Sequence, residues 1–265
     1  MNSVILIPAR YGSSRYPGKP LVELKGADGA SKPLILRSVD AARRVPGVSG
    51  VFVTTDDERI ADACTRYGVG VIMTPTDCRN GTERCAEAVK QLHDANLVIN
   101  FQGDALLTPP TFVEALIERM QQESDALVAT PALRLRSEEV RTLQAEESAG
   151  RVGGTSVVTD LNRHALYFSK RLIPHLPDGA LDGEMSPVRL HVGVYAYRPI
   201  ALDIYAATPP SELEMLEGLE QLRFLDAGVR VAVVEVQPPP FALRELNNPE
   251  DVEPIEQALR EAGLE

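Results

Sequence analysis

The sequence predicts an α/β fold, in which helices cover both faces of a mostly parallel central sheet. Short apolar runs alternate with amphipathic stretches through the first half of the chain. The apolar runs are continuous, as in strands that are buried on both faces. Polar clusters follow several runs, and parallel sheets bind ligands beyond the carboxyl ends of their strands. The expected strands cover 3–9, 48–57, 69–75 and 96–105, and the expected helices cover 34–45, 57–68, 81–93 and 109–122.

The second half of the chain is more mixed. Strands are expected at 126–136 and 229–236, and two strands should flank a turn at 160–162. Residues 137–147 fit either a short helix or a solvated loop. A single strand is expected over 189–199. One amphipathic helix is expected over 211–228, and another should close the sequence over 247–263.

Composition restricts the class of protein. The net charge of −11 argues against an extended nucleic-acid interface. Three cysteines form neither an even disulfide framework nor a zinc-site spacing, which favours reduced thiols in the cytoplasm. The first apolar run is too short for a signal peptide, and no run approaches the length of a membrane span. We therefore expect a cytoplasmic protein with no membrane or nucleic-acid partner.

A basic loop follows the first expected strand. Arg10, Arg15 and Lys19 lie within ten residues of one another, and two glycines separate them. Such a loop can place backbone N–H groups and cations around phosphate oxygens. The P-loop pattern does not fit, because Pro20 stands where Ser or Thr would bind magnesium, and no G-x-G-x-x-G is present. Either a different kind of phosphate loop or a solvated basic loop remains open.

Asp104 follows the expected strand at 96–105. A carboxylate in this position can bind Mg²⁺ together with triphosphate oxygens and water, although Asp also commonly caps turns. A triphosphate loop and a magnesium carboxylate together indicate nucleotidyl or phosphoryl transfer.

These motifs resemble those of the CMP-Kdo synthetases, the 3-deoxy-manno-octulosonate cytidylyltransferases. Only residues 138–154 and 174–187 lack a distinctive counterpart. The resemblance implies a Rossmann-like nucleotide-diphospho-sugar transferase fold in a single domain over residues 1–265. An excursion near residues 150–200 would carry acceptor contacts and a dimer surface. The matching segments are IPARYGSSRYPGKPL, VTTDDERIADAC, VIMTP, NGTERCAEAV, NFQGDALLTPP, ALYFS, LHVGVYAYR, LEMLEGLEQLRFLDAG and NNPEDVE.

The resemblance also implies a set of site residues. Arg10, Arg15 and Lys19 would bind the triphosphate and, with Asp104, take part in catalysis. Asp104 and Asn247 match the positions of magnesium ligands. The nucleotide-binding set is Pro8, Ala9, Arg10, Lys19, Thr74, Arg84 and Gln102. The set facing the acidic sugar is Lys170 or Arg171, His191, Tyr195, Glu220 and Gln221.

The implied reaction is attack of an anomeric hydroxyl on the α-phosphorus of CTP, with Mg²⁺ as cofactor. It gives a CMP-sugar and pyrophosphate without a covalent enzyme intermediate, so orientation and charge stabilisation supply the catalysis. The implied partners are CTP and an acidic small molecule such as Kdo. A homodimer is implied by the resemblance alone.

Some of these residues also have plainer interpretations. His191 could be a half-buried strand histidine bonded to the backbone. Glu214, Glu217 and Glu220 lie three apart on the expected helix, so some of them should be merely solvated.

Three departures from the family pattern fall on the metal and acceptor side. Asn247 stands in place of an Asp and removes one negative charge from the metal site. Lys170 stands in place of an Arg and lacks its bidentate geometry. Ala105 and Leu106 replace Glu-Pro.

Three alternatives therefore remain open. The protein could be a cytidylyltransferase for a different acidic acceptor, such as a phosphonate. It could be a non-catalytic nucleotide-binding homologue, or a nucleotidyltransferase for another base.

Overall fold

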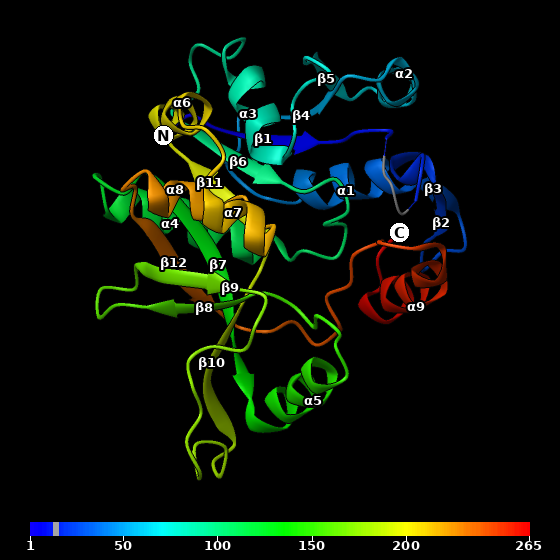
Figure 1. Ribbon diagram of the computed structural model, residues 1–265. Helices are drawn as coiled ribbons and strands as arrows, with labels where there is room; N and C mark the ends of the chain where they lie inside the picture. Colours follow the sequence, from blue (N-terminus) through cyan, green and yellow to red (C-terminus); the bar gives the residue numbers. More distant parts are fainter. Residues whose placement is uncertain (13–15) are drawn as a thin grey trace.

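The computed structural model describes residues 1–12 and 16–265. Within these residues, ten strands form one central sheet in the order β5-β4-β1-β6-β11-β7-β10-β8-β9, with β12 beside β7 (Figure 1). A separate ribbon joins β2 (Glu23–Lys25) and β3 (Ser31–Pro33). The strands of the central sheet are β1 (Ser3–Pro8), β4 (Gly50–Thr55), β5 (Gly70–Met73), β6 (Leu97–Phe101), β7 (Val128–Arg136), β8 (Ser156–Thr159), β9 (Ala165–Ser169), β10 (Met185–His191), β11 (Val194–Tyr197) and β12 (Val231–Val236).

The half of the sheet formed by β5, β4, β1 and β6 is parallel, and this places the carboxyl ends of these strands at one edge. Strands β5, β4, β1 and β6 pair in parallel, as do β7 and β12. Strand β11 runs antiparallel between β6 and β7, and β10, β8 and β9 extend the sheet antiparallel. The predicted α/β fold is confirmed. The segment near 150–200 contributes β8 to β11 to this same sheet.

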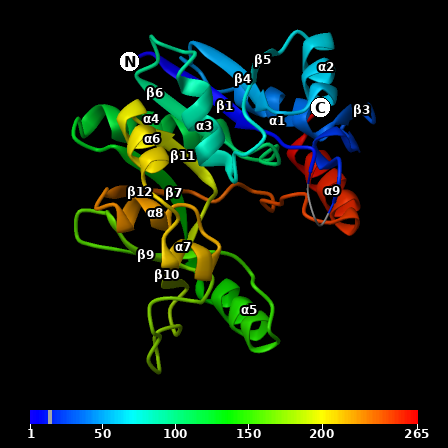
Figure 2. The same ribbon diagram turned by 45° about the horizontal axis from the view of Figure 1, so that its top comes forward.

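Helices cover both faces because residues along each strand alternate between two cores. Ile5 and Ile7 of β1 pack in the core that contains α1, α2 and α4. Val4 and Leu6 pack in the opposite core, which contains α3, α6 and α8. Figure 2 shows α3 and α6 side by side on that second face. The helices are α1 (Leu34–Arg43), α2 (Glu58–Arg66), α3 (Gly81–Val89), α4 (Pro110–Gln122), α5 (Ser137–Ser148), α6 (Pro199–Ala207), α7 (Glu212–Glu217), α8 (Leu222–Asp226) and α9 (Val252–Ala262).

The strand predicted over 189–199 is in fact two strands. Strand β10 ends at His191 and β11 begins at Val194, and both pair with β7. The break lies opposite Pro131 of β7, which has no N–H to donate to the ladder. The Val192 N–H instead donates to the Pro131 carbonyl at 3.0 Å. Val194, the first residue of β11, pairs with Phe101 at the carboxyl end of β6.

The helix predicted over 211–228 is also divided. Helix α7 ends at Gly218, which adopts a left-handed conformation with φ 61°, and α8 begins at Leu222. Gly tolerates this conformation without the Cβ clash that other residues suffer. Ser211 starts α7 with a capping box closed by Glu214. The C-terminal helix α9 also begins later than predicted, because a short turn, Pro249–Asp251, precedes it.

Of the helices in the described ranges, none is both long and apolar enough to cross a bilayer.

Candidate active site

A cleft of about 980 Å³ lies beyond the carboxyl ends of β1 and β6. It is lined by residues from the N-terminal loop, the start of α3, the end of β6, strands β10 and β11, the break between α7 and α8, and the segment before α9. These segments lie far apart in the sequence, and the sheet order brings them together. The strand-end clusters are therefore gathered at one site, as predicted.

The basic loop begins at the mouth of this cleft. Pro8, Ala9 and Arg10 leave the end of β1 and line the cleft, as does Lys19. The Gly18 N–H donates to the Tyr11 carbonyl at 2.9 Å and closes the base of the loop, which brings Arg10 and Lys19 to the same side. The predicted triphosphate residue Arg15 lies outside the described residues.

Lys19 and Asp104 form an ion pair inside the cleft. Their Nζ and Oδ2 atoms are 2.5 Å apart, and both side chains are largely buried. Asp104 leaves β6 through Gly103, whose Cα lies so close to β1 that a Cβ would stand 2.7 Å from the Pro8 carbonyl oxygen. A glycine is therefore required here for the β6 loop to lie against the end of β1. Gln102 lines the same wall.

Arg84 enters the cleft from α3. Asn80 caps this helix by accepting from the Glu83 N–H at 2.8 Å. The buried Arg84 guanidinium donates to Thr74 Oγ1 at 2.5 Å and lies 3.2 Å from Asp56 Oδ1, so two strand ends fix its direction. Thr74 itself is buried behind Arg84 and does not line the cleft.

His191 lines the cleft from the end of β10. Its ring packs against Phe168 and Tyr195, and its Nε2 lies 2.9 Å from Thr130 Oγ1. The Thr130 hydroxyl already donates to the Val194 carbonyl at 2.8 Å, so Nε2 carries the proton and Nδ1 is an acceptor. Burial lowers the pKa of His191 to about 3, which keeps the ring neutral.

Tyr195, Gln221 and Glu220 continue this wall. The Tyr195 hydroxyl donates to Gln221 Oε1 at 3.2 Å, while Gln221 Nε2 is buried and has no acceptor among the described residues. Buried donors are rarely left unpaired, so this amide suits a ligand oxygen. Glu220 accepts from the Thr82 N–H at 3.1 Å, and burial raises its pKa.

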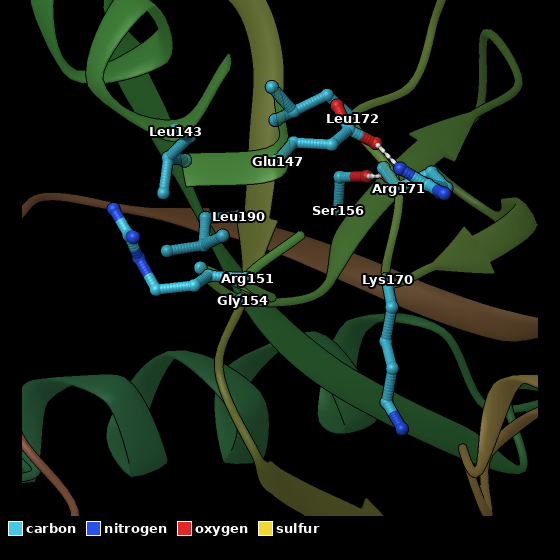
Figure 3. Close-up of a pocket in the computed structure, with 10 residues that line it drawn as sticks. Leu143, Glu147, Arg151, Gly154, Ser156, Lys170, Arg171, Leu172 and Leu190 are labelled. Carbon is cyan, nitrogen blue, oxygen red and sulfur yellow. Dashed lines mark hydrogen bonds and ion pairs between the residues drawn. The ribbon is translucent and has the colours of Figure 1, made fainter. Parts of the chain in front are cut away.

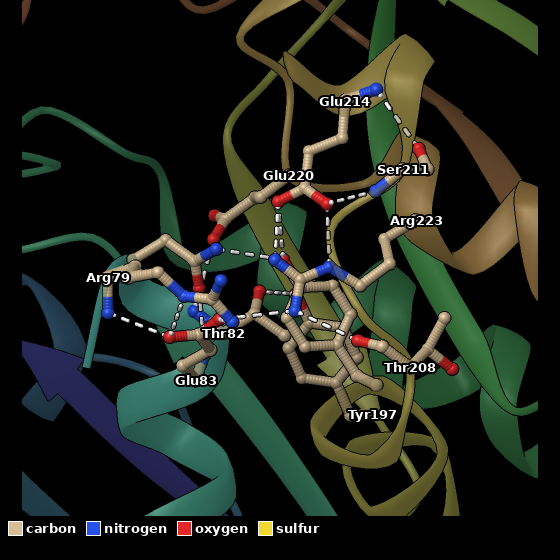
Figure 4. A network of polar contacts seen from close by, with 11 residues as sticks. Arg79, Thr82, Glu83, Tyr197, Thr208, Ser211, Glu214, Glu220 and Arg223 are labelled. Atoms are coloured by element: carbon tan, nitrogen blue, oxygen red, sulfur yellow. Dashed lines mark hydrogen bonds and ion pairs between the residues drawn. The ribbon is translucent and has the colours of Figure 1, made fainter. Parts of the chain in front are cut away.

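A buried polar network connects α3 with α7 and α8 (Figure 4). Arg223 donates to both carboxylate oxygens of Glu214, at 2.6 and 2.5 Å, and to Glu83 Oε1 at 3.1 Å. Its guanidinium also stacks over the Tyr205 ring at 3.9 Å. Burial opposes the positive charge, but the hydrogen bonds that Arg223 donates to Glu214 and Glu83 outweigh this effect and raise the pKa of Arg223. Helix α7 is thus joined to α3 through Arg223.

The expectation that some of the glutamates at 214, 217 and 220 are merely solvated is wrong, because each has a specific partner. Glu214 bonds Arg223, Glu220 bonds the start of α3, and Glu217 bonds the end of β9. The break at Gly218 explains the difference, because it directs Glu220 and Gln221 into the cleft rather than along a helix surface.

Lys170 and Arg171 point in different directions (Figure 3). Lys170 lines the cleft, whereas Arg171 pairs with Glu147 Oε1 at 3.1 Å on the surface, and 75% of its side chain is exposed. Of the two candidates for the acidic sugar, the structure brings only Lys170 to the cleft. Arg171 borders a small adjoining hollow.

Asp104 and Asn247 both line the cleft and offer side-chain oxygen atoms that can bind a metal ion. Leu106 and Leu246 pack in one apolar cluster with α9, which holds the loop after Asp104 beside the segment that carries Asn247. The substitution at Leu106 is therefore a packing feature. Within the described ranges, no group of three or more His, Cys, Asp or Glu side chains could hold a metal alone. One carboxylate and one amide oxygen fit Mg²⁺, which takes few protein ligands when substrate phosphates complete its shell.

Sequence reasoning missed several residues of the cleft. Arg79 and Asn80 line it, and Asn80 carried a visible helix-start signal. Arg244 and Glu245 line it from the segment before α9, where no periodicity marks them. Gly153 and Gly154 come from a stretch that had no family counterpart.

Comparison with known proteins identifies the family of this chain. The model of the cytidylyltransferase family matches residues 4–231, and the chain belongs to this family. It is 40% identical over 266 residues to the 3-deoxy-manno-octulosonate cytidylyltransferase of Maricaulis maris (strain MCS10), with 99% of each chain covered. It is 38% identical over 262 residues to the 8-amino-3,8-dideoxy-manno-octulosonate cytidylyltransferase of Shewanella baltica (strain OS195), covering 98% of this chain and 99% of that one.

A solved structure is also similar over the full length. It is a CMP:2-keto-3-deoxy-manno-octonic acid synthetase complexed with CTP, with a TM-score of 0.84 and 34% sequence identity. The alignment covers 99% of this chain and 100% of that one. The resemblance inferred from the motifs is confirmed.

The neutral His191 predicts a specific pH dependence of stability. In the unfolded chain its pKa is about 6.5, against about 3 in the fold, so the unfolded state binds more protons between these values. The free energy of unfolding should therefore fall as the pH is lowered through this range. The variant His191→Gln keeps a donor for Thr130 but does not titrate. Between pH 7 and pH 5, its free energy of unfolding should fall by about 1–2 kcal/mol less than that of the unchanged protein.

Urea denaturation at the two pH values measures this difference, with the exposed His93→Gln as the comparison variant. Equal acid sensitivity of the unchanged protein and His191→Gln would assign the dependence to other groups.

Proposed function

We propose that this protein transfers CMP from CTP to an acidic eight-carbon sugar and releases pyrophosphate. The observation that carries the proposal is that one cleft holds the Lys19–Asp104 pair on one wall and the Lys170, His191 and Gln221 set on the other. The first wall suits a metal-bound triphosphate. The second suits a hydroxylated carboxylate. Two reactants held across one cleft react as if in a single molecule.

On the nucleotide wall, Arg10 and Lys19 would lower the charge of the triphosphate as the α–β bond breaks. Lys19 already contacts Asp104, so its ammonium is held in position before substrate binds. Arg84, fixed by Thr74 and Asp56, and Gln102 would hold the nucleoside. Asn100 Nδ2, at the end of β6, is another buried donor without a partner in the described structure.

Asp104 and Asn247 would hold Mg²⁺, which when bound neutralises phosphate charge and activates the acceptor oxygen as a Lewis acid. Dependence on Mg²⁺ is our proposal, supported by the oxygen donor set at this wall.

On the acceptor wall, the Lys170 ammonium would receive the sugar carboxylate, and the Gln221 amide would donate to a sugar oxygen. His191 Nδ1 would accept from a sugar hydroxyl without adding a charge. The two relatives compared above are named for acceptors that differ in an amino group at carbon 8. We therefore propose an octulosonate acceptor, and both the 3-deoxy and the 8-amino-3,8-dideoxy sugars are candidates to be compared.

We further propose a homodimer located in the cytoplasm. Three large apolar side chains of α7 are exposed, namely Leu213, Met215 and Leu216, and Leu166 of the adjoining β9 is 62% exposed. Exposed apolar side chains in this number support a protein interface. The three cysteines are buried free thiols, which supports a reducing compartment.

Pyrophosphate release tests the proposed function. We expect release from CTP and Mg²⁺ with Kdo, with 8-amino-3,8-dideoxy-manno-octulosonate, or with both, and little release with ATP, GTP or UTP. A phosphonate should be inactive. Turnover with another base or with the phosphonate alone would contradict the proposal. Binding of CTP with no turnover across the panel would favour a non-catalytic homologue.

Asp104→Asn should reduce the turnover of CTP by about 100-fold or more, because the variant loses the carboxylate charge that would hold Mg²⁺ on the triphosphate wall. The exposed Asp94→Asn makes the same chemical change elsewhere and should keep full turnover. Circular dichroism melting would verify that both variants are folded. Full activity of a folded Asp104→Asn would place the metal at another residue.

Asn247→Asp should restore a charge to the metal wall and lower the half-saturating Mg²⁺ concentration by about 3–10-fold. Asn248→Asp is the matched control, since it adds the same charge one residue away and does not line the cleft. Binding of Mn²⁺ with CTP, followed by paramagnetic resonance, gives a readout that is independent of turnover. Equal gains in both variants would indicate a general charge effect and remove Asn247 from the site.

A further inference from the structure

Glu217 joins α7 to the end of strand β9. Its Oε1 accepts from the Ser169 hydroxyl at 2.8 Å and from the Tyr167 hydroxyl at 3.4 Å. Its Oε2 accepts from the backbone N–H of Lys170 at 2.9 Å. One carboxylate thus holds three donors that lie between 47 and 50 residues away in sequence. The contacts fix the backbone from which the Lys170 side chain leaves.

The Lys170 side chain is directed by a second contact. Its ammonium lies against Gly218, so close that a Cβ on Gly218 would stand 2.9 Å from Nζ. Gly218 has φ 61° and ends α7 directly after Glu217. Among the described residues, none forms an ion pair with the Lys170 ammonium. Because Gly218 has no Cβ, the Lys170 ammonium can lie against it and so reach the cleft.

We propose that Glu217 and Gly218 form a positioning device for Lys170. The proposal rests on the function assigned above, in which the Lys170 ammonium receives the carboxylate of the sugar acid. Glu217 fixes the start of the side chain and Gly218 gives room for its end. A lysine has four rotatable bonds and costs conformational entropy to hold, so a device that limits its positions lowers the cost of binding the acceptor.

Neither residue touches the acceptor in this scheme. Both act through Lys170, and their effects should appear in acceptor binding and leave nucleotide binding unchanged. A merely structural role would lower stability and disturb both substrates alike. The two roles are therefore separated by comparing the KM for each substrate.

Gly218→Ala is the sharpest variant, because the added methyl group displaces the ammonium, the mobile end of a flexible side chain. We expect the KM for the acceptor to rise about tenfold, with the KM for CTP changed less than about twofold. Gly228→Ala is the matched control. Gly228 also follows a helix at positive φ, 74°, but a Cβ there would meet nothing within 4 Å. Both variants should melt at similarly lowered temperatures.

Glu217→Ala should likewise raise the KM for the acceptor about tenfold. Glu217→Gln keeps one accepting oxygen, so its KM for the acceptor should lie between those of the unchanged protein and Glu217→Ala. Glu212→Ala, exposed on the same helix, is its control and should leave both KM values unchanged. The decisive variants combine Gly218→Ala or Glu217→Ala with Lys170→Ala. If both residues act through Lys170, neither adds to the effect of Lys170→Ala alone.

The outcomes are distinct. Suppose that the unchanged protein turns over. The inference is then overturned if the KM for the acceptor is equal in Gly218→Ala and Gly228→Ala. It is also overturned if the effects of the single variants multiply in the double variants. Silence of the unchanged protein with every acceptor would overturn the proposed function itself, and this inference with it.

Discussion

The buried guanidinium of Arg223 holds the two walls of the cleft together. It contacts Glu214 of α7 and Glu83 of α3, and it stacks on Tyr205 of α6. A charge in such a position is tolerated only when its partners are complete, and removing one partner leaves the others buried and unpaired. The break between α7 and α8 is thereby fixed relative to the start of α3. The positions of Glu220, Gln221 and Lys170 all depend on this arrangement.

The chemistry of the cleft changes from one wall to the other. On the nucleotide wall, cations already have acidic partners, as in the pairs Lys19–Asp104 and Arg84–Asp56, so their positions are set before a ligand arrives. On the wall that carries Lys170, His191 is neutral, and the Gln221 amide has no acceptor within the part of the chain that the structure describes. A carboxylated sugar would therefore meet the Lys170 ammonium in a setting of hydrogen-bonding groups. This division matches the asymmetry between a triphosphate and a monoanionic sugar.

Much of the fold, and the gathering of strand-end residues at one cleft, could be predicted from the sequence because parallel strands impose their own geometry. Continuous apolar runs identified β1, β4, β5 and β6, and the carboxyl ends of such strands must meet at one edge. The break at Gly218 could not be predicted, because the amphipathic period continues through it and only tertiary contacts select the left-handed conformation. The break before Val194 depends on Pro131, which lies some 60 residues away in sequence. The opposite directions of Lys170 and Arg171 follow from partners, Glu217 and Glu147, that no local pattern indicates.

Strand β11 has a consequence for the order in which the molecule is completed. It lies between β6 and β7, two strands that precede it in the chain by more than 50 residues, and it carries Tyr195. While a ribosome is still making the chain, β1, β4, β5 and β6 can pair, but β7 has no neighbour that connects it to them until β11 emerges. Such distant pairing costs loop-closure entropy and slows folding. The cleft residue Tyr195 is thus placed by the same event that joins the two halves of the sheet, after Pro8, Ala9 and Gln102 can already lie at the ends of β1 and β6.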